Sequence, residues 1–255
     1  MFRAAEAYDR FVGRYSAELG RALIAAAVVE PGSRALDVGC GPGALTAELV
    51  AVLGADRVAA AEPSEPFADA CRARMPGVRV EVAPAEALPF EDGEFDHALA
   101  QLVVNFMSDA PAGVREMARV TRPGGTVAAA VWDYAGEMTL LRGFWDAAAA
   151  VDPAASERDE SRMPYSSPGA LATLWSDAGL TDVSDSAVVV GAHYDGFDDL
   201  WAPLDQGIGP AGAYAASLDA GLRTALKTEL RRRLGVGDEP FRLTARAWVA
   251  CGRVP

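Results

Sequence analysis

Short apolar runs alternate with amphipathic segments along the first half of the chain. The apolar runs lack a polar residue at every second position, which is typical of strands covered on both faces of a sheet. They span residues 33–39, 57–62, 78–84, 95–106 and 124–134. The amphipathic segments carry apolar residues at helical spacing and span residues 18–29, 43–54, 64–75 and 112–121. This alternation predicts a doubly wound α/β fold around a mostly parallel, Rossmann-like sheet.

The pattern becomes looser in the second half of the chain. A helix is expected at 167–180, and two late strands at 183–194 and 241–252 bring the predicted sheet to seven strands. The stretches 134–166 and 195–236 lack a strand pattern, so we predict that they are helical insertions. Insertions of this length beside the last strands are expected to form a cap over the sheet edge.

Composition and charge restrict the partners that the protein is expected to have. The chain has 255 residues, of which 51% are hydrophobic, so it can bury a sizeable core. A formal net charge of −13 repels polyanions, so we expect no nucleic-acid partner. Apolar runs fall short of the ~20 residues of a membrane span, so no membrane insertion is expected. The charged first residues are unlike a signal peptide, which predicts a cytoplasmic location.

The cysteines and lysines add two further expectations. Cys40, Cys71 and Cys251 lie far apart in the sequence, and no CxxC pair occurs. The pattern therefore indicates neither a disulfide framework nor a zinc site, and we expect reduced thiols and no bound metal. Lys227 is the only lysine among 23 basic residues, a bias typical of GC-rich bacterial genomes.

The segment "LDVGCGPG" is the sharpest motif. Gly39, Gly41 and Gly43 follow a predicted strand and open a helix, where glycine allows a tight turn and a close approach to a ligand. The spacing also fits a dinucleotide site, and Glu62 at the end of the next strand suits ribose hydroxyls in either case. Asp37, directly before the glycines, would repel the pyrophosphate of NAD and attract an ammonium group. Electrostatics therefore favours S-adenosylmethionine (SAM) over NAD.

Four motifs occur in the order typical of one enzyme family. The "LDVGCGPG" loop, Glu62, "AEALPFEDGEFD" and "REMARVTRPGG" resemble those of class I SAM-dependent methyltransferases. The small-molecule group that includes ubiquinone, menaquinone and sterol methyltransferases is the most similar, over about Tyr8 to Asp133. The resemblance implies methyl transfer from SAM to a small-molecule acceptor by in-line displacement, with S-adenosylhomocysteine (SAH) as the product. The whole chain, 1–255, is then a single methyltransferase domain. Its parts would be an N-terminal helical segment (1–30), a SAM-binding core (31–133) and the two cap insertions.

The resemblance also implies a set of cofactor-binding residues. Glu62 would accept hydrogen bonds from both ribose hydroxyls, and Phe67 would lie against the adenine unless it belongs to the ordinary core. Arg14 would pair with the SAM carboxylate. Pro84 stands where the family usually has an aspartate, so the adenine amino group needs another acceptor, either Glu86 or a backbone carbonyl. The full set is Asp37, Gly39, Cys40, Gly41, Gly43, Glu62, Pro63, Phe67, Ala85, Glu86, Gln101, Tyr8, Arg14 and Tyr15.

The sequence indicates the acceptor site less clearly than it indicates the cofactor site. Aromatic residues of the predicted cap either line an apolar acceptor pocket or form the core of the cap itself, and Trp132 and Trp201 are the candidates for acceptor contact. His193 and Asp133 are the candidates for proton removal, although the catalytic residues are otherwise unknown. The "NPPY"-type tetrapeptide of DNA-adenine methyltransferases is absent after the fourth strand, which favours a small-molecule acceptor.

Two alternatives to methyl transfer stay open. The first is a SAM-binding protein of the same fold with a non-methylating role, such as a cyclase, or with a purely binding role. The second is an NAD-dependent oxidoreductase, against which Asp37 and the absence of a YxxxK pair both count. The sequence is compatible with a monomer or a homodimer.

Overall fold

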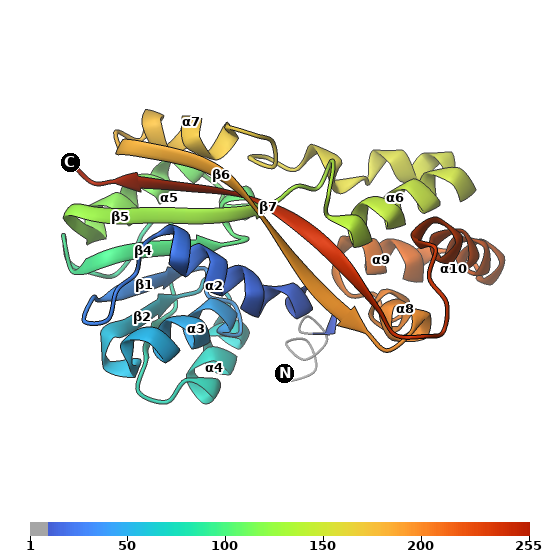
Figure 1. The fold of residues 1–255 in the computed structure, drawn as a ribbon, viewed down its shortest axis with the longest axis horizontal. Helices are drawn as coiled ribbons and strands as arrows, with labels where there is room; N and C mark the ends of the chain where they lie inside the picture. The colour runs from blue at the N-terminus through green and yellow to red at the C-terminus, as the bar shows by residue number, and fades with distance from the viewer. Residues whose placement is uncertain (1–9) are drawn as a thin grey trace.

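Seven strands form one twisted sheet in the computed structural model, which describes residues 10–255 (Figure 1). The strands are β1 (Ala35–Val38), β2 (Val58–Ala61), β3 (Arg79–Glu81), β4 (Phe95–Gln101), β5 (Thr121–Trp132), β6 (Thr181–Tyr194) and β7 (Phe241–Arg253). Their order is β3-β2-β1-β4-β5-β7-β6. Strand β7 runs antiparallel to β5 and β6, and the remaining pairs are parallel. The prediction of a mostly parallel, seven-stranded Rossmann-like sheet is confirmed.

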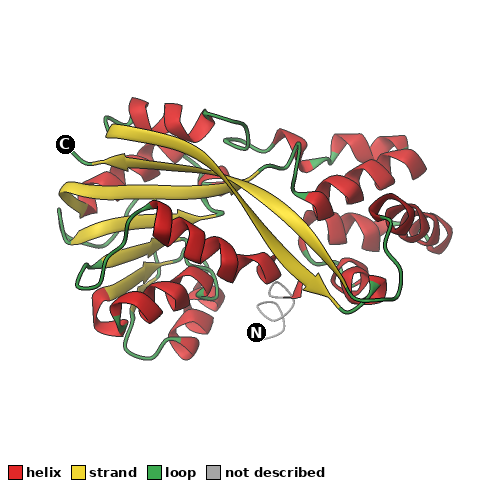
Figure 2. Ribbon diagram, viewed as in Figure 1, coloured by secondary structure: helices red, strands yellow, loops and turns green. Residues whose placement is uncertain are grey.

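Helices cover both faces of the sheet (Figure 2). They are α2 (Ser16–Ala26), α3 (Ala44–Leu53), α4 (Glu65–Arg74), α5 (Ala110–Val120), α6 (Thr139–Val151), α7 (Ala170–Asp177), α8 (Phe197–Asp205), α9 (Gly209–Ser217) and α10 (Ala220–Leu234). Helices α2 and α3 contact each other on one face, and α5 and α7 contact each other on the opposite face. Every residue of β1 and β2 is buried, because both faces of these strands are covered. This burial explains why the strands read as unbroken apolar runs.

Helices from both predicted insertions gather at one end of the molecule. Strands β6 and β7 pair along almost their whole length and continue beyond the rest of the sheet as a two-stranded ribbon (Figure 1). Helices α6, α8, α9 and α10 lie at the far end of this ribbon, where α6 packs against α10. The insertions therefore lie beyond the strand ends, at the side of the molecule remote from β3.

The cap has an aromatic core of its own. Phe144 and Trp145 are buried on α6, with ring centroids 5.1 Å apart, and Tyr214 of α9 packs against both. The polar atoms of these rings are satisfied inside the cap: Trp145 Nε1 donates to Glu160 at 2.9 Å, and the Tyr214 hydroxyl donates to Asp152 at 2.9 Å. These aromatic side chains therefore hold the cap helices together.

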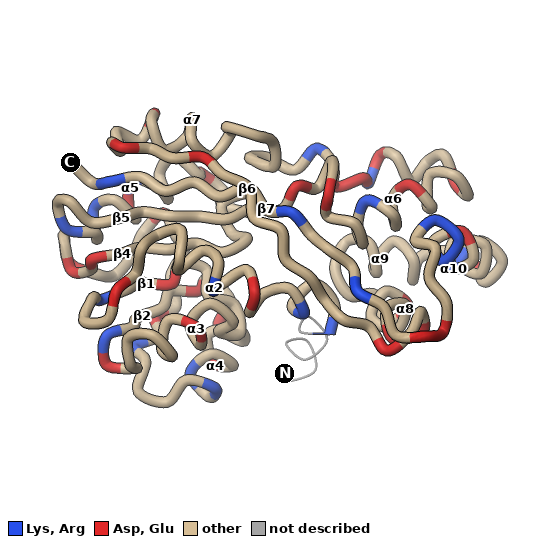
Figure 3. The backbone as a smooth tube through the Cα atoms, in the orientation of Figure 1, with Lys and Arg blue, Asp and Glu red and all other residues tan. Residues whose placement is uncertain are grey.

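Charged residues of both signs are distributed over the whole chain (Figure 3). Basic residues gather at the end of α10, where Arg231, Arg232 and Arg233 lie in the last turn. Arg232 and Arg233 pair with Glu229, and Arg231 pairs with Asp238. None of the described helices has the length and apolar content needed to cross a membrane.

An ion pair between a buried carboxylate and a half-buried arginine joins the end of β5 to β7. Asp133 Oδ2 accepts hydrogen bonds from Nε and Nη2 of Arg246, at 3.0 and 2.7 Å, and from the backbone N–H of Glu137 at 2.8 Å. Nη1 of Arg246 also donates to the exposed Glu137 carboxylate at 2.7 Å. The antiparallel course of β7 brings Arg246 to Asp133 and fixes the start of the chain that leads to the cap.

We expect Asp133→Ala to lower the free energy of unfolding by about 3 kcal/mol, because Arg246 and a backbone N–H lose their buried acceptor. Glu137→Ala is the matched control: it removes only an exposed ion pair and should cost less than about 1 kcal/mol. Urea denaturation of both variants measures the difference. Equal, small losses in the two variants would show that Asp133 does not anchor the cap.

Candidate cofactor site

The glycine loop between β1 and α3 has a backbone that only glycine adopts readily. Gly39 and Gly41 have positive φ values of 71° and 53°. The N–H groups of Gly39 and Cys40 both donate to the carbonyl of Ala61, at 2.8 and 3.1 Å, which holds the loop against the end of β2. A Cβ atom on Gly39 would lie 2.5 Å from Val103, whereas a Cβ atom on Gly41 would meet only open space. The loop is therefore packed on one side and open on the other.

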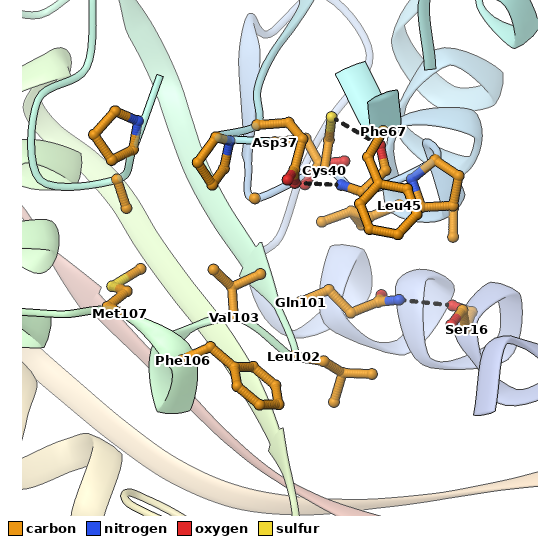
Figure 4. Close-up of a pocket in the computed structure, with 18 of the residues that line it drawn as sticks. Ser16, Asp37, Cys40, Leu45, Phe67, Gln101, Leu102, Val103, Phe106 and Met107 are labelled. Atoms are coloured by element: carbon orange, nitrogen blue, oxygen red, sulfur yellow. Dashed lines mark hydrogen bonds between the residues drawn. The ribbon is translucent and has the colours of Figure 1, made fainter. Parts of the chain in front are cut away.

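A cavity of about 470 Å³ lies on the open side of this loop, at the carboxyl ends of β1, β2 and β4. Figure 4 shows Asp37 and Cys40 on one wall, facing Gln101, Leu102 and Val103 on the other. Most of the predicted cofactor residues line it: Asp37, Gly39, Cys40, Gly41, Glu62, Pro63, Phe67, Ala85, Glu86 and Gln101. Gly43 instead caps the start of α3, with a φ of 97°.

Asp37 is buried at the end of β1 and faces the cavity, with 1% of its surface exposed. It accepts a hydrogen bond from the hydroxyl of Thr46 at 2.6 Å. Burial, opposed by this hydrogen bond and reinforced by the nearby Glu62, raises the pKa of Asp37 to about 7. A positively charged ligand in the cavity would favour the ionised form of this carboxyl group.

Glu62 directly follows β2 and presents both carboxylate oxygens to backbone donors. Oε2 accepts from the N–H of Gly41 and Oε1 from the N–H of Ser64, each at 2.9 Å. These bonds join the glycine loop to the start of α4 and fix the orientation of the carboxylate on the cavity wall. A carboxylate held in this way can accept two hydrogen bonds from a vicinal diol.

Gln101, at the end of β4, has one polar atom paired and one unpaired. Its Nε2 donates to the backbone carbonyl of Ser16 at 3.1 Å, which joins β4 to the start of α2. Its Oε1 is buried without a hydrogen-bond donor among the described residues. The Gln101 side chain lines the cavity, whereas this oxygen lies against α2, 3.2 Å from the position of a Cβ atom on Gly20.

The loop after β4 forms an apolar rim that the sequence did not predict. It turns at Leu102, which has a φ of 63°, and continues as the short helix η3 (Val104–Phe106). Leu102, Val103, Phe106 and Met107 line the cavity, and Phe106 is 61% exposed. Other lining residues that the prediction missed are Ser16, Pro42, Ala44, Leu45, Pro84 and Ser108. The sequence did contain a signal for this rim, because the apolar stretch "LVVNFM" continues beyond Gln101, where β4 ends.

The predicted N-terminal contacts have other partners. Both terminal nitrogens of Arg14 donate to the carboxylate of Asp199 on α8, at 2.8 and 2.6 Å, and its guanidinium lies 4.8 Å from the Tyr194 ring centroid. Tyr15 is fully buried, with its hydroxyl 3.2 Å from that of Tyr194. Neither Arg14 nor Tyr15 lines the cavity, and Tyr8 lies outside the described residues. These contacts join the N-terminal segment to the cap.

The predicted acceptor and catalytic side chains also lie outside the lining of the cavity. Trp132 is buried with its ring edge-on to Tyr15, and Trp201 stacks on Phe197 inside the cap. Asp133 is held by Arg246. His193 lies near the end of β6, on the ribbon that leads to the cap. Trp132 and Asp133 are held in the sheet by Tyr15 and Arg246, whereas Trp201 and His193 lie on the cap and on the ribbon that extends beyond the sheet. Within residues 10–255, no group of three or more His, Cys, Asp or Glu residues could hold a metal ion.

Comparison with known proteins places the chain in a family. Residues 36–129 match the family described as "Methyltransferase domain". The demethylmenaquinone methyltransferase of Roseiflexus castenholzii is 30% identical over 207 residues, which cover 74% of this chain and 87% of that protein. An uncharacterised protein of Mycobacterium tuberculosis is 38% identical over 119 residues. That match covers 46% of this chain and 43% of the relative, so it spans less than half of the relative's length.

The fold agrees with this match. The YcgJ protein of Bacillus subtilis superposes with a TM-score of 0.59 at 20% identity, over 93% of this chain and 97% of that one. This superposition covers more of the chain than the family match over residues 36–129 does. The chain belongs to the class I SAM-dependent methyltransferases, in the group related to the quinone methyltransferases.

Proposed function

We propose that the protein binds SAM in the described cavity and transfers its methyl group to a small-molecule acceptor. The observation that carries this proposal is the negative charge of the cavity lining. The described lining includes three carboxylates, Asp37, Glu62 and Glu86, and no Lys, Arg or His. Such a wall suits a ligand with positive charge and no phosphate, which describes SAM, and it opposes the pyrophosphate of NAD.

The residues of the wall fit the separate parts of the cofactor. Asp37, ionised, suits the positive charge of the amino-acid part, and the Gln101 side chain lines the same part of the cavity. Glu62 offers two oxygens to the ribose diol, and Phe67 offers an apolar face to the adenine. Glu86 is the acceptor that we propose for the adenine amino group, since Pro84 lacks one. The backbone N–H of Asp109 already donates to Glu86 at 3.1 Å, which holds that carboxylate in place.

The protein contributes alignment and exclusion of water. SAM, when bound, supplies a methyl group that is activated by the positive sulfur. Leu102, Val103 and Phe106 shield the open side of the cavity with apolar surface, which excludes water from the reacting atoms. The described lining contains no His, Lys or Tyr, so we propose that the rate depends on orienting the two reactants.

A ligand panel and a product assay test the proposed function. Calorimetry should show binding of SAM and SAH and no comparable binding of NAD. With a pool of small apolar acceptors, SAM should be converted to SAH. Tight NAD binding without SAM binding would overturn the cofactor assignment. SAM binding without SAH formation from any acceptor would favour the cyclase or binding-only alternative.

We expect Glu62→Ala to weaken SAH binding by about 100-fold, because two charge-assisted hydrogen bonds of roughly 1.5–3 kcal/mol each are lost and water replaces part of them. Glu48→Ala is the matched control, since Glu48 faces α2, where it pairs with Arg21, and lies outside the cavity lining. Calorimetry gives both affinities, and circular dichroism confirms that both variants are folded. An unchanged affinity in folded Glu62→Ala would remove Glu62 from the site.

We expect SAH affinity to rise roughly tenfold between pH 6 and pH 7.5, because Asp37, whose pKa is about 7, must lose its proton to face the ligand ammonium group. Thr46→Val removes the hydrogen bond that lowers the pKa of Asp37, so the midpoint of the profile should move to higher pH. Calorimetry across this range measures both profiles. A flat profile in the wild-type protein would show that Asp37 does not meet the positive charge.

A further inference from the structure

Two cysteines that are far apart in the sequence meet beside the cofactor cavity. Cys40 belongs to the glycine loop and Cys71 to α4. Together with Ala60, Ala68 and Val80 they form a small core cluster, separate from the main core of the protein. Both thiols are free, and 5% of the Cys40 surface and none of the Cys71 surface is exposed. The fold therefore creates a dithiol that the spacing in the sequence did not indicate.

Both cysteines pack in this cluster, and a Cβ atom on Gly43, three residues after Cys40, would lie 3.0 Å from the Sγ atom of Cys71. Cys40 Sγ also lies 3.4 Å from the carbonyl oxygen of Gly41, an alternative acceptor for its single S–H. Cys71 Sγ and Thr46 Oγ1 are 3.7 Å apart and hydrogen-bonded, and the same Thr46 hydroxyl donates to Asp37. Movement of either sulfur therefore disturbs the wall of the cofactor cavity.

The electrostatics of the pair favour the thiolate form of Cys71 over that of Cys40. The hydrogen bond from Cys40 lowers the pKa of Cys71, and Thr46 and Arg74 add to this effect against the opposing burial. The pKa of Cys40 is raised by the same hydrogen bond and by burial. Cys40 lines the cavity, so an oxidant small enough to enter the cavity reaches this sulfur first.

We propose that Cys40 and Cys71 form a redox-sensitive pair, and that a peroxide-class oxidant converts them to a disulfide that closes the cofactor site. The closing of the site rests on the proposed function, because the cofactor that it excludes is SAM. Formation of the disulfide rests only on the geometry of the two cysteines.

The oxidation balances with one peroxide for each pair. Cys40 passes its proton to the Cys71 thiolate, and the Cys40 thiolate formed in this way attacks one peroxide oxygen, so that a sulfur–oxygen bond forms and the oxygen–oxygen bond breaks. The leaving hydroxide takes that proton from Cys71 and becomes water. The Cys71 thiolate then attacks the sulfur of the Cys40 sulfenic acid: the disulfide forms, the sulfur–oxygen bond breaks, and the leaving hydroxide takes a proton from solvent and becomes the second water. The two sulfurs lose two electrons in total, which reduce the peroxide.

Disulfide formation changes the loop because the loop has little room to adapt. A disulfide places two sulfurs about 2.05 Å apart, much closer than in a hydrogen bond. Cys40 must therefore move toward α4, while the neighbouring Gly39 is held by the carbonyl of Ala61 and packed against Val103. The N–H of Gly41, which binds Glu62, moves with it. By linkage, a ligand that needs the reduced loop protects the pair from oxidation.

The test uses the whole protein, hydrogen peroxide as oxidant and SAH as ligand. After oxidation, intact mass should fall by about 2 Da, the two thiol hydrogens, and peptide mapping should identify a Cys40–Cys71 link. SAH affinity should fall at least about tenfold and return after dithiothreitol, and excess SAH present during oxidation should slow formation of the link. Cys71→Ser and Cys71→Ala should bind SAH before peroxide and form no link, and peroxide should add oxygen to their Cys40 in place of the link. Cys251→Ser, which removes the third cysteine, should respond like the wild type.

Two outcomes would overturn the proposal. In one, peroxide produces no Cys40–Cys71 link under conditions that oxidise the half-buried Met75, Met107 and Met163. In the other, the link forms and SAH affinity does not change. A reduced protein that binds no SAH is a separate result, which overturns the proposed cofactor and leaves the mapped link as evidence about the dithiol.

Discussion

The site depends on the burial of Asp37 without an opposite charge. Its only polar partner among the described side chains is the Thr46 hydroxyl, so the folded protein holds this carboxyl group with a pKa of about 7. Because the ordinary value is 3.8, the folded state binds the proton more tightly than the unfolded state does between about pH 4 and pH 7. The stability that this group contributes therefore falls as pH rises through that range, by a total on the order of 4 kcal/mol. A bound cation offsets this cost, so the cavity is destabilised when empty and favours a positively charged ligand.

Sheet topology determines where this carboxyl group lies and what surrounds it. Strand order changes direction between β1 and β4, so the loops that follow these two strands separate and leave a crevice at their carboxyl ends. Asp37 and the glycine loop come from one side, and Gln101 and the apolar rim come from the other (Figure 4). The antiparallel strand β7 has a different effect. It extends with β6 into the ribbon that carries the cap, and its Arg246 engages Asp133.

Helix α4 joins the redox chemistry of the dithiol to the electrostatics of the cofactor wall. Its Cys71 touches the glycine loop through Cys40 and touches Asp37 through Thr46. Its first residues follow Ser64, whose N–H is bound by Glu62. A change at one of these residues therefore reaches the others through direct contacts.

The sequence by itself determined the elements and the cofactor half of the site. Strand runs, helical spacing and the glycine loop are local patterns, and local backbone preference fixes them. Because the predicted cofactor residues belong to these local patterns, ten of them, Asp37 and Glu62 among them, line the cavity. Only the tertiary structure decided the rest. The direction of β7 placed Arg246 beside Asp133, the packing of Tyr15 buried Trp132, and the ribbon placed Trp201 and His193 outside the cavity lining. The packing of α4 brought Cys71 to Cys40 across 30 intervening residues. Such pairings arise from contacts between distant segments, and hydrophobic periodicity carries no information about which segments meet.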